Sequence, residues 1–600
     1  MRMVFALVFV SLLGSSAARA ATRAADPTRR VILDGGDSHH RLAVDSIWTR
    51  RRSIHELEQR VRTAPRDRIA LDRLGAAYYD AHFMHSAQTM FARALALDSN
   101  DADARFGLGR TLERSWLDEP VPSTLAAARE QLEAAVRARP EFYEAWVTLA
   151  AVRFEERDVP AAGEAARVAL TLAPDGLEAQ LAAASLAYRS GLLARADSLF
   201  GIAIPRCPPG IAKRFADITP LLSEAEQLDF GELGARAKAE YVRRFWGRSD
   251  PDPTTPQNEA RLEFCSRITH ALLLIGDPWS PHWLARTDVY TRYGHLVQLR
   301  DEESAAQTEM SHVAWGEVAD DPTLEALATV HQDVVGGGAA VFAPLPPGAR
   351  VLPLAWSVTR FEGPRGARLA VRVETPGTPS DARFADCIVL DAAEHELARD
   401  TRALSPSGCD PAALRSGEFA FDVPPGRCRV AVAVRDTAGG RGVGRADREV
   451  ATPSEALGMS DVVLACGVGG AADPQGPVTV YPNLRARVES RQDLYAYFEV
   501  YHLRQGDGGA NRCEYEYTVR DVWTRAPRPL LGRGHASAPP PRLSFRSTRE
   551  GVGPLRRQFL RVPAAALPAG RYRLTVTVRD ELAGSVTEQS TEFEKAVGER

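Results

Sequence analysis

A period of about 34 residues constrains this chain more than any other feature of its sequence. Pro140, Pro174 and Pro208 are separated by this period, and alanines recur at the same spacing. Proline ends a helix because it lacks a backbone N–H and restricts the residue before it. Small residues recur where two helices cross closely. The period therefore predicts stacked pairs of helices over residues 47–210. The recurring alanines are Ala128, Ala162 and Ala196 in one series and Ala135, Ala169 and Ala203 in another.

An earlier copy of the pattern covers residues 74–94, and a half-copy ending at Pro65 precedes it. The stretch "RSWLDEPVPST" is expected to lengthen the inter-helix loop of the second copy. These positions resemble the tetratricopeptide repeat (TPR) family, whose stacked repeats form a superhelix with a concave face. The resemblance implies that this face binds peptides or partner proteins, although any single side chain on it could also belong to a solvated helix surface. The candidate partner-binding residues are Asp72, Tyr79, Arg110, Glu113, Phe154, Tyr188 and Arg189.

The N-terminus has the pattern of a secretory leader. Arg2 precedes an apolar run at 4–13, and Ala18-Arg19-Ala20 supplies a small-x-small cleavage site. The pattern predicts removal of residues 1–20, a linker at 21–46, and a periplasmic or secreted bacterial protein. A membrane anchor is disfavoured because the apolar run is short, and no later segment approaches the roughly 18 apolar residues of a membrane helix.

Composition limits the remaining function classes. The 600 residues require several domains, and a net charge of −4 gives no reason to expect nucleic acid. Seven cysteines permit disulfides in an oxidising compartment, and their odd number leaves at least one thiol unpaired unless chains cross-link. Cys207 and Cys265 are expected to be small buried hydrophobes. The pairing of the others stays open.

The middle segment contains "FWGRSDPDPTTPQNEARLEF" at 245–264. Its prolines exclude a regular helix, and Thr255 is predicted to cap a helix that begins at Pro256. This stretch resembles the opening of the bacterial GWxTD domain family, found in exported proteins. "PHWLARTDVYTRYGH" at 281–295 matches a later strand of that family around Tyr290, although the motif that names the family is not intact. The resemblance implies a mixed α/β module over residues 211–340.

Polar residues of this segment permit two interpretations. A buried, ion-paired scaffold is favoured, because structural ion-pair networks also hold perturbed charges. The alternative is a polar binding site, which a hydrolase of the cell envelope could use within 248–290. The residues concerned are Arg248, Asp250, Asn258, Glu259, Arg261, Arg286 and Tyr290.

Two related β-patterns follow, at 423–440 and 567–584, and they align with each other over their whole length. Each has a proline-glycine turn before a strand that alternates apolar and polar residues, which is typical of a strand with one face in a core. They predict β-sandwiches of immunoglobulin-like type at 341–455 and 456–600.

We therefore expect a multidomain α+β protein consisting of a TPR α-solenoid, a mixed α/β module and two β-sandwiches. Zinc, nucleophile-elbow, phosphate-loop and dinucleotide motifs are missing from the sequence, so no metal or cofactor is expected and an enzyme is disfavoured. The expected function is an exported scaffold that binds partner proteins through the TPR groove. The alternatives are an envelope hydrolase and a carbohydrate- or surface-binding structural protein.

Overall fold

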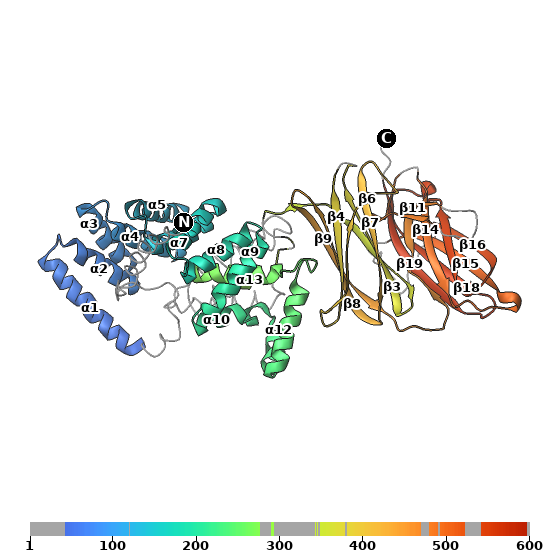
Figure 1. Ribbon diagram of the computed structural model, residues 1–600, viewed down its shortest axis with the longest axis horizontal. Coiled ribbons are helices and arrows are strands. Elements are labelled where there is room, and N and C mark those ends of the chain that lie inside the picture. The colour runs from blue at the N-terminus through green and yellow to red at the C-terminus, as the bar shows by residue number, and fades with distance from the viewer. Residues whose placement is uncertain are drawn as a thin grey trace, which may run out of the picture. The chain divides into compact units, whose positions relative to one another are not determined.

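A computed structural model of the chain describes residues 43–118, 121–275, 290–292, 342–343, 345, 348–378, 381–469, 479–489, 492–522 and 542–596. The predicted leader and Arg286 lie outside these residues, as does nearly all of the predicted linker. The chain divides into a helical unit, up to Lys238 together with Arg261–Phe342, and a β-unit, Ala239–Ala260 together with Ala343–Arg600. Figure 1 shows the helices in blue to green and the strands in yellow to red.

The helical unit begins, within the described residues, with α1 (Ala43–Thr63) and continues as four helix pairs. Three residues join the helices of each pair, so the chain turns back on itself. The inner helices α2 and α4 begin one period of about 34 residues apart, and so do helices α6 and α8. This spacing confirms the predicted period. The pairs are α2 (Arg68–Asp80) with α3 (Met84–Leu97), α4 (Ala102–Asp118) with α5 (Pro122–Ala138), α6 (Tyr143–Glu155) with α7 (Val159–Leu172), and α8 (Leu177–Arg189) with α9 (Leu193–Ala203).

The recurring alanines are fully buried, as the period predicts. The ring of Phe91 on α3 packs against two glycines, Gly75 on α2 and Gly107 on α4. Leu132 on α5 packs against Gly109 in the same way. Small residues on the inner helices therefore make room for large apolar side chains, and this alternation fixes the distance between successive helices.

The expected long loop in the second copy is wrong. Its extra residues lengthen both helices instead, since α4 and α5 each have 17 residues where α6 has 13. Trp116 lies in the added turn of α4 and packs against the apolar core that α4 shares with α6. Continuing the helix buries this ring in part, which a loop at the same place would not do.

Replacing Gly107 by alanine is expected to destabilise the helical unit by about 1–3 kcal/mol, because the new methyl group would lie 2.3 Å from the ring of Phe91. The matched control is Gly163→Ala in α7, where the new methyl group meets nothing within 4 Å. That change should stabilise the unit by about 0.5–1 kcal/mol, because alanine favours helix. Urea unfolding followed by circular dichroism measures both, and equal effects would contradict the packing.

The described elements between α9 and the strands of the β-unit are short helices joined by turns. The predicted strand at Tyr290 is wrong where it can be compared, because residues 290–292 form a helical turn. The predicted helix start at Pro256 is also wrong, because α13 begins at Glu259. The elements are η1 (Ile204–Arg206), α10 (Pro209–Ala216), η2 (Thr219–Leu221), α11 (Glu224–Glu232), α12 (Ala235–Ser249), α13 (Glu259–His270) and a π-helical turn (Ala271–Ile275).

The first half of the β-unit is two sheets with one shared apolar core, to which Val371 and Phe419 of one sheet and Val430 and Val432 of the other belong. Their strand orders are β1-β9-β8-β4-β5 and β2-β3-β7-β6. The strands are β1 (Arg350–Val351), β2 (Ala355–Gly363), β3 (Gly366–Pro376), β4 (Arg383–Asp391), β5 (Glu396–Ala403), β6 (Ser405–Pro406), β7 (Leu414–Val423), β8 (Gly426–Asp436) and β9 (Gly440–Val450).

The second half repeats this plan. One sheet has the order β13-β19-β18-β15-β16, and the other has β10-β14-β11-β12 with β17 paired to β14. The strands are β10 (Gly458–Met459), β11 (Val463–Gly469), β12 (Thr479–Pro482), β13 (Arg487–Val488), β14 (Leu494–Tyr501), β15 (Ala510–Asp521), β16 (Leu543–Val552), β17 (Arg556–Val562), β18 (Gly570–Asp580) and β19 (Val586–Lys595), with short helical turns η5 (Asp507–Gly509) and η6 (Ala564–Ala566).

The two halves of the β-unit share one arrangement of strands. The central strands β8 and β18 begin and end at positions that the two sequence patterns align. Each has an antiparallel neighbour on either side, and each sheet adds a short parallel strand at its edge. The alternating residues predicted to face the core are buried in both copies, as Val432 and Val576 show. In β8 the intervening Ala431 and Ala433 are buried too, so the prediction of one water-facing side is wrong there. The immunoglobulin-like type stays a prediction.

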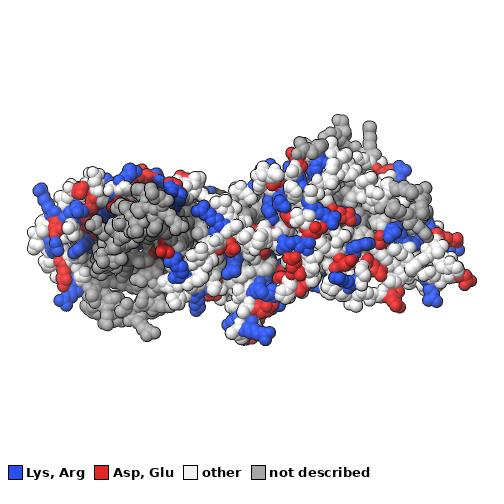
Figure 2. Space-filling view, in the orientation of Figure 1, with Lys and Arg blue, Asp and Glu red and all other residues white. Residues whose placement is uncertain are grey.

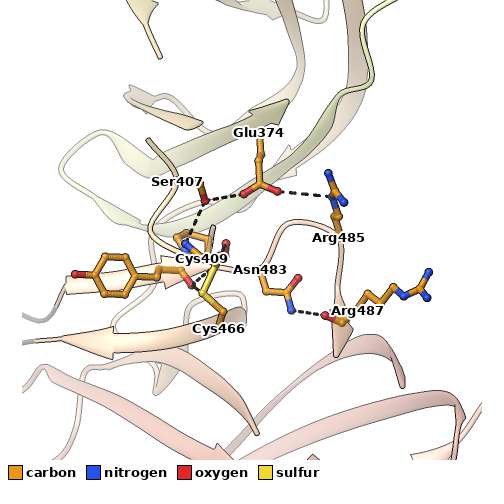
Figure 3. Close-up of a disulfide and its surroundings, with 9 residues drawn as sticks. Glu374, Ser407, Cys409, Cys466, Asn483, Arg485 and Arg487 are labelled. Atoms are coloured by element: carbon orange, nitrogen blue, oxygen red, sulfur yellow. Dashed lines mark hydrogen bonds and ion pairs between the residues drawn. A yellow bond between two sulfur atoms is a disulfide. The ribbon is translucent and has the colours of Figure 1, made fainter. Parts of the chain in front are cut away.

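A disulfide between Cys409 and Cys466 joins the two sandwiches (Figure 3). Next to it, the buried Glu374 accepts a hydrogen bond from Ser407 at 2.9 Å and lies 3.7 Å from the guanidinium of Arg485. The first pair comes from one sandwich and Arg485 from the other. A covalent bond and a buried charge therefore hold the sandwiches together at one place.

The thiols of Cys207 and Cys265 are buried, as predicted. Burial raises the pKa of the Cys207 thiol to about 11 and that of Cys265 to about 12. Both thiols therefore stay protonated near neutral pH and pack as small apolar groups.

Charge is mixed over the visible face of the strands, where basic and acidic side chains alternate (Figure 2). The strands carry cross-strand ion pairs such as Arg573 with Glu592 at 2.7 Å. Within the described residues, no helix has both the length and the apolar character that a membrane span requires.

Candidate functional site

Four of the seven candidate partner-binding residues lie at equivalent places in the four helix pairs. Tyr79, Glu113, Phe154 and Tyr188 are each the twelfth residue of their helices α2, α4, α6 and α8. Arg189 follows Tyr188, Arg110 lies one turn before Glu113, and Asp72 lies near the start of α2. The solenoid therefore repeats one inner position along the array, which is how the sequence could locate these residues.

The first two repeats bring a cationic and an aromatic group together. The Arg110 guanidinium donates a 3.0 Å hydrogen bond to the Tyr79 hydroxyl and lies 4.7 Å from the centre of that ring. A second ring, Phe106, lies 5.8 Å from the same guanidinium. Such cation–π contacts hold an arginine in one orientation while leaving its other N–H groups able to donate.

Two carboxyls of these repeats hold protons more tightly than usual. Burial raises the pKa of Glu113 to about 8 and that of Asp72 to about 6. The positive charge of Arg110 partly offsets the rise in the pKa of Glu113. Arg68 does the same for the pKa of Asp72, from which its guanidinium lies 3.4 Å away. Near neutral pH this surface therefore contains hydrogen-bond donors and acceptors as well as fixed charges.

The last two repeats are in contact with a helix of the same chain. Tyr188 donates a 3.3 Å hydrogen bond to Glu263 on α13, and Ser185 and Ser266 share one of 2.7 Å. Farther along α13, the His270 ring packs edge-on against Phe154, with ring centres 4.8 Å apart. Phe154, Tyr188 and Arg189 are thus engaged within the helical unit, whereas their role toward a partner stays a prediction.

This array is similar to solved tetratricopeptide-repeat proteins. MamA from Desulfovibrio magneticus RS-1 is 19% identical, and the match covers 29% of this chain and 96% of that one at a TM-score of 0.24. YrrB, described as a TPR protein with an unusual peptide-binding site, is 18% identical over 36% and 96%, at 0.24. TTC0263 from Thermus thermophilus is 18% identical over 30% and 96%, at 0.25. No family model and no curated protein matches the chain.

The polar stretch of the middle segment forms a turn that the β-unit holds through arginines. Asp252 is buried and forms an ion pair with Arg441 on β9. Its other carboxylate oxygen accepts hydrogen bonds from Thr254, 2.5 Å from the hydroxyl and 3.2 Å from the amide nitrogen. Arg399 on β5 donates to the carbonyl of Thr254 at 2.8 Å. We call residues 250–255 the clamped turn, and its ion pairs support the scaffold interpretation.

Beside the clamped turn, Asp250 and Glu259 form a buried carboxyl pair. Burial, reinforced by Asp250, raises the pKa of Glu259 to about 9, and burial raises that of Asp250 to about 6. Glu259 therefore keeps its proton near neutral pH. Thr255 donates a 2.7 Å hydrogen bond to its carboxyl group. Exposed fractions of 9% for Asp250 and 2% for Glu259 leave little access for a substrate.

The other predicted polar residues have separate roles. Arg248 lies 4.0 Å from Glu394 of the β-unit, and Asn258 donates to the carbonyl of Trp246 at 2.7 Å. Arg261 is exposed on α13.

Tyr290 belongs to the helical unit rather than to a site with the polar stretch. Its ring lies 5.0 Å from that of His270. His270 is buried, and its ring is also bonded to Glu155 at 2.8 Å. The predicted cluster within 248–290 is therefore divided between two units of the fold.

A cavity of about 460 Å³ lies between the two sandwiches. Its lining includes the ion pair of Arg360 and Asp461, and strand β19 contributes Ser590 and Thr591. None of the described residues that line it is aromatic.

Several residues of these sites have no signal in the sequence. Arg441 lies 189 residues after Asp252, and Ser266 lies 81 residues after Ser185. Both arginine and serine are common on protein surfaces, so neither position stands out by type. The spacing of the polar residues of α13 is a local signal, because it places them on one helix face.

Proposed function

We propose that this protein is an exported scaffold that binds partner proteins through the inner face of its first two helical repeats. The carrying observation is the cluster of Tyr79, Phe106 and Arg110, which places two rings and a guanidinium on α2 and α4. Aromatic residues and arginine contribute most to binding energy at protein interfaces. Half-buried residues of these types lose little side-chain entropy when a partner covers them.

Chemistry within the middle segment is not part of this proposal. A hydrolase would need a carboxyl group that reaches its substrate. Asp250 and Glu259 are instead buried and bonded at the clamped turn of the β-unit. The pair fits a structural role, and the GWxTD-like stretch is accordingly proposed to join the helical array to the strands.

A position-specific cross-link tests the proposed binding face. A photoreactive phenylalanine analogue at Tyr79 is expected to form adducts with a defined envelope protein in producing cells. The matched control places the same analogue at Arg137, which is 68% exposed on the outer helix α5. Adducts identified by mass spectrometry should appear at position 79 and not at 137. Equal adducts at both positions, or none at 79, would contradict the proposal.

Export is supported by the disulfide that joins the sandwiches, since such bonds persist in oxidising compartments. The native protein, purified without reductant and then unfolded, is expected to expose five thiols to alkylation, and seven after reduction. Mass spectrometry of the same sample should place the N-terminus after Ala20. Seven thiols without reduction, or an intact leader, would argue against an exported protein.

A further inference from the structure

The inner face of the last two repeats carries an unusual number of buried polar groups. Ser185, Tyr188 and Arg189 on α8 are all buried, although an inner face exposed to water would leave such groups solvated. Opposite them, the buried polar residues of α13 include Glu263, Ser266 and His270. Burying polar groups is unfavourable unless each finds a hydrogen-bond partner. The contacts between the two surfaces supply some of those partners, and Arg267 of α13 itself forms a 2.6 Å ion pair with Glu263.

The contacts follow a regular pattern along α13. Glu263, Ser266, His270 and Leu273 are spaced by three, four and three positions, so they form one stripe on the helix and the turn that continues it. Glu263 accepts from Tyr188, and Ser266 accepts a 3.3 Å hydrogen bond from the Arg189 side chain. His270 bonds to Glu155 on α6 at 2.8 Å. Leu273 packs against the apolar cores of α6 and α8.

The receiving surface has the repeat symmetry of the solenoid. Phe154 and Glu155 end α6, and Tyr188 and Arg189 end α8 at the equivalent places of the next repeat. The Arg189 guanidinium lies 5.3 Å from the centre of the Phe154 ring and so connects the two repeats. One helix lying across both repeats meets a ring from each, an acceptor from α6 and a donor from α8. This is a site for a helix rather than for an extended peptide, because the four contacts match helical spacing.

We propose that the inner face of α6 and α8 is a helix-binding site whose resident ligand is α13 of the same chain. The chemistry of the ligand is a carboxylate, a small hydroxyl, an imidazole and a leucine at the spacing of residues 263, 266, 270 and 273. A helix of another protein occupies this surface only by presenting that stripe and displacing α13. The inference is independent of whether the first two repeats bind a partner.

A fluorescent peptide of residues 259–273, with serine at Cys265, tests the site on the full chain. The wild-type protein is expected to bind it weakly, because α13 already fills the surface. Ser266→Arg and Glu263→Lys release the resident helix by adding a large or like-charged side chain. Fluorescence anisotropy should show at least tenfold tighter peptide binding to either variant. A peptide carrying Ser266→Arg should lose that gain.

A disulfide lock separates the possible occupants. The Ser185 and Ser266 oxygens lie 2.7 Å apart, so the double variant Ser185→Cys/Ser266→Cys is expected to form a bond within one chain and to bind no peptide. The single variant Ser185→Cys controls for pairing with the neighbouring Cys265. A disulfide-linked dimer would assign the site to α13 of a second copy and overturn the proposal. The proposal would also be overturned if Ser266→Arg and Glu263→Lys kept the circular dichroism of the wild type but bound the peptide no more tightly than the wild type does.

Discussion

Asp252→Asn is expected to release the clamped turn from strand β9. The free energy of unfolding should fall by about 3 kcal/mol. The side chain of Asp252 is 3% exposed, and its partner Arg441 is 22% exposed. Removing one member of a buried ion pair leaves the other without its counter-charge in a poorly solvated place, which is costly. Hydrogen exchange of residues 250–258 should accelerate about 100-fold, the factor that corresponds to this free energy.

The matched control for this prediction is an exposed ion pair of the same β-unit. Glu592 lies 2.7 Å from Arg573, and the two side chains are 38% and 57% exposed. Glu592→Gln should change stability by less than about 1 kcal/mol, because water already solvates both charges. Unchanged exchange in residues 250–258 of the Asp252 variant would show that the arginines do not hold the turn.

Raising the pH from 5 to 9 is expected to weaken the β-unit through the carboxyl pair. The folded protein raises the pKa of Glu259 to about 9 from an ordinary value of 4.5, chiefly by burial. Between these two values the folded state binds a proton that the unfolded chain has released. Stability from this proton is complete below pH 4.5 and is lost as the pH rises toward 9. Asp250 adds the same trend at lower pH.

Glu259→Gln removes the titration while keeping a neutral donor beside Asp250. At pH 8 the variant should be more stable than wild type by several kcal/mol, and the difference should be much smaller at pH 5. Urea unfolding read by pulsed hydrogen exchange on β-unit peptides measures the difference. Glu113→Gln is the matched control, because its carboxyl has a pKa of about 8 in the helical unit. A parallel pH dependence of wild type and variant in the β-unit would contradict the raised pKa of Glu259.

Local repetition made much of the fold predictable. The helix pairs could be derived from the sequence because helix ends, close crossings and apolar positions recur at one short interval, as Pro140, Pro174 and the buried Ala162 show. Strands β8 and β18 were predictable because alternation places every second residue in a core. Predictions failed where a local pattern had two solutions. The extra residues of α4 could form a loop or more helix, and packing of Trp116 decided.

The sequence by itself determined the repeating helices and the paired β-copies, since each depends on residues close in the chain. Tertiary structure decided that α13 lies on α6 and α8, that arginines of β5 and β9 hold the clamped turn, and that Cys409 pairs with Cys466. These contacts join residues separated by 57 to 189 positions. These contacts form only once whole helices and strands have packed together. Local patterns in the sequence do not indicate which distant residues will then lie side by side.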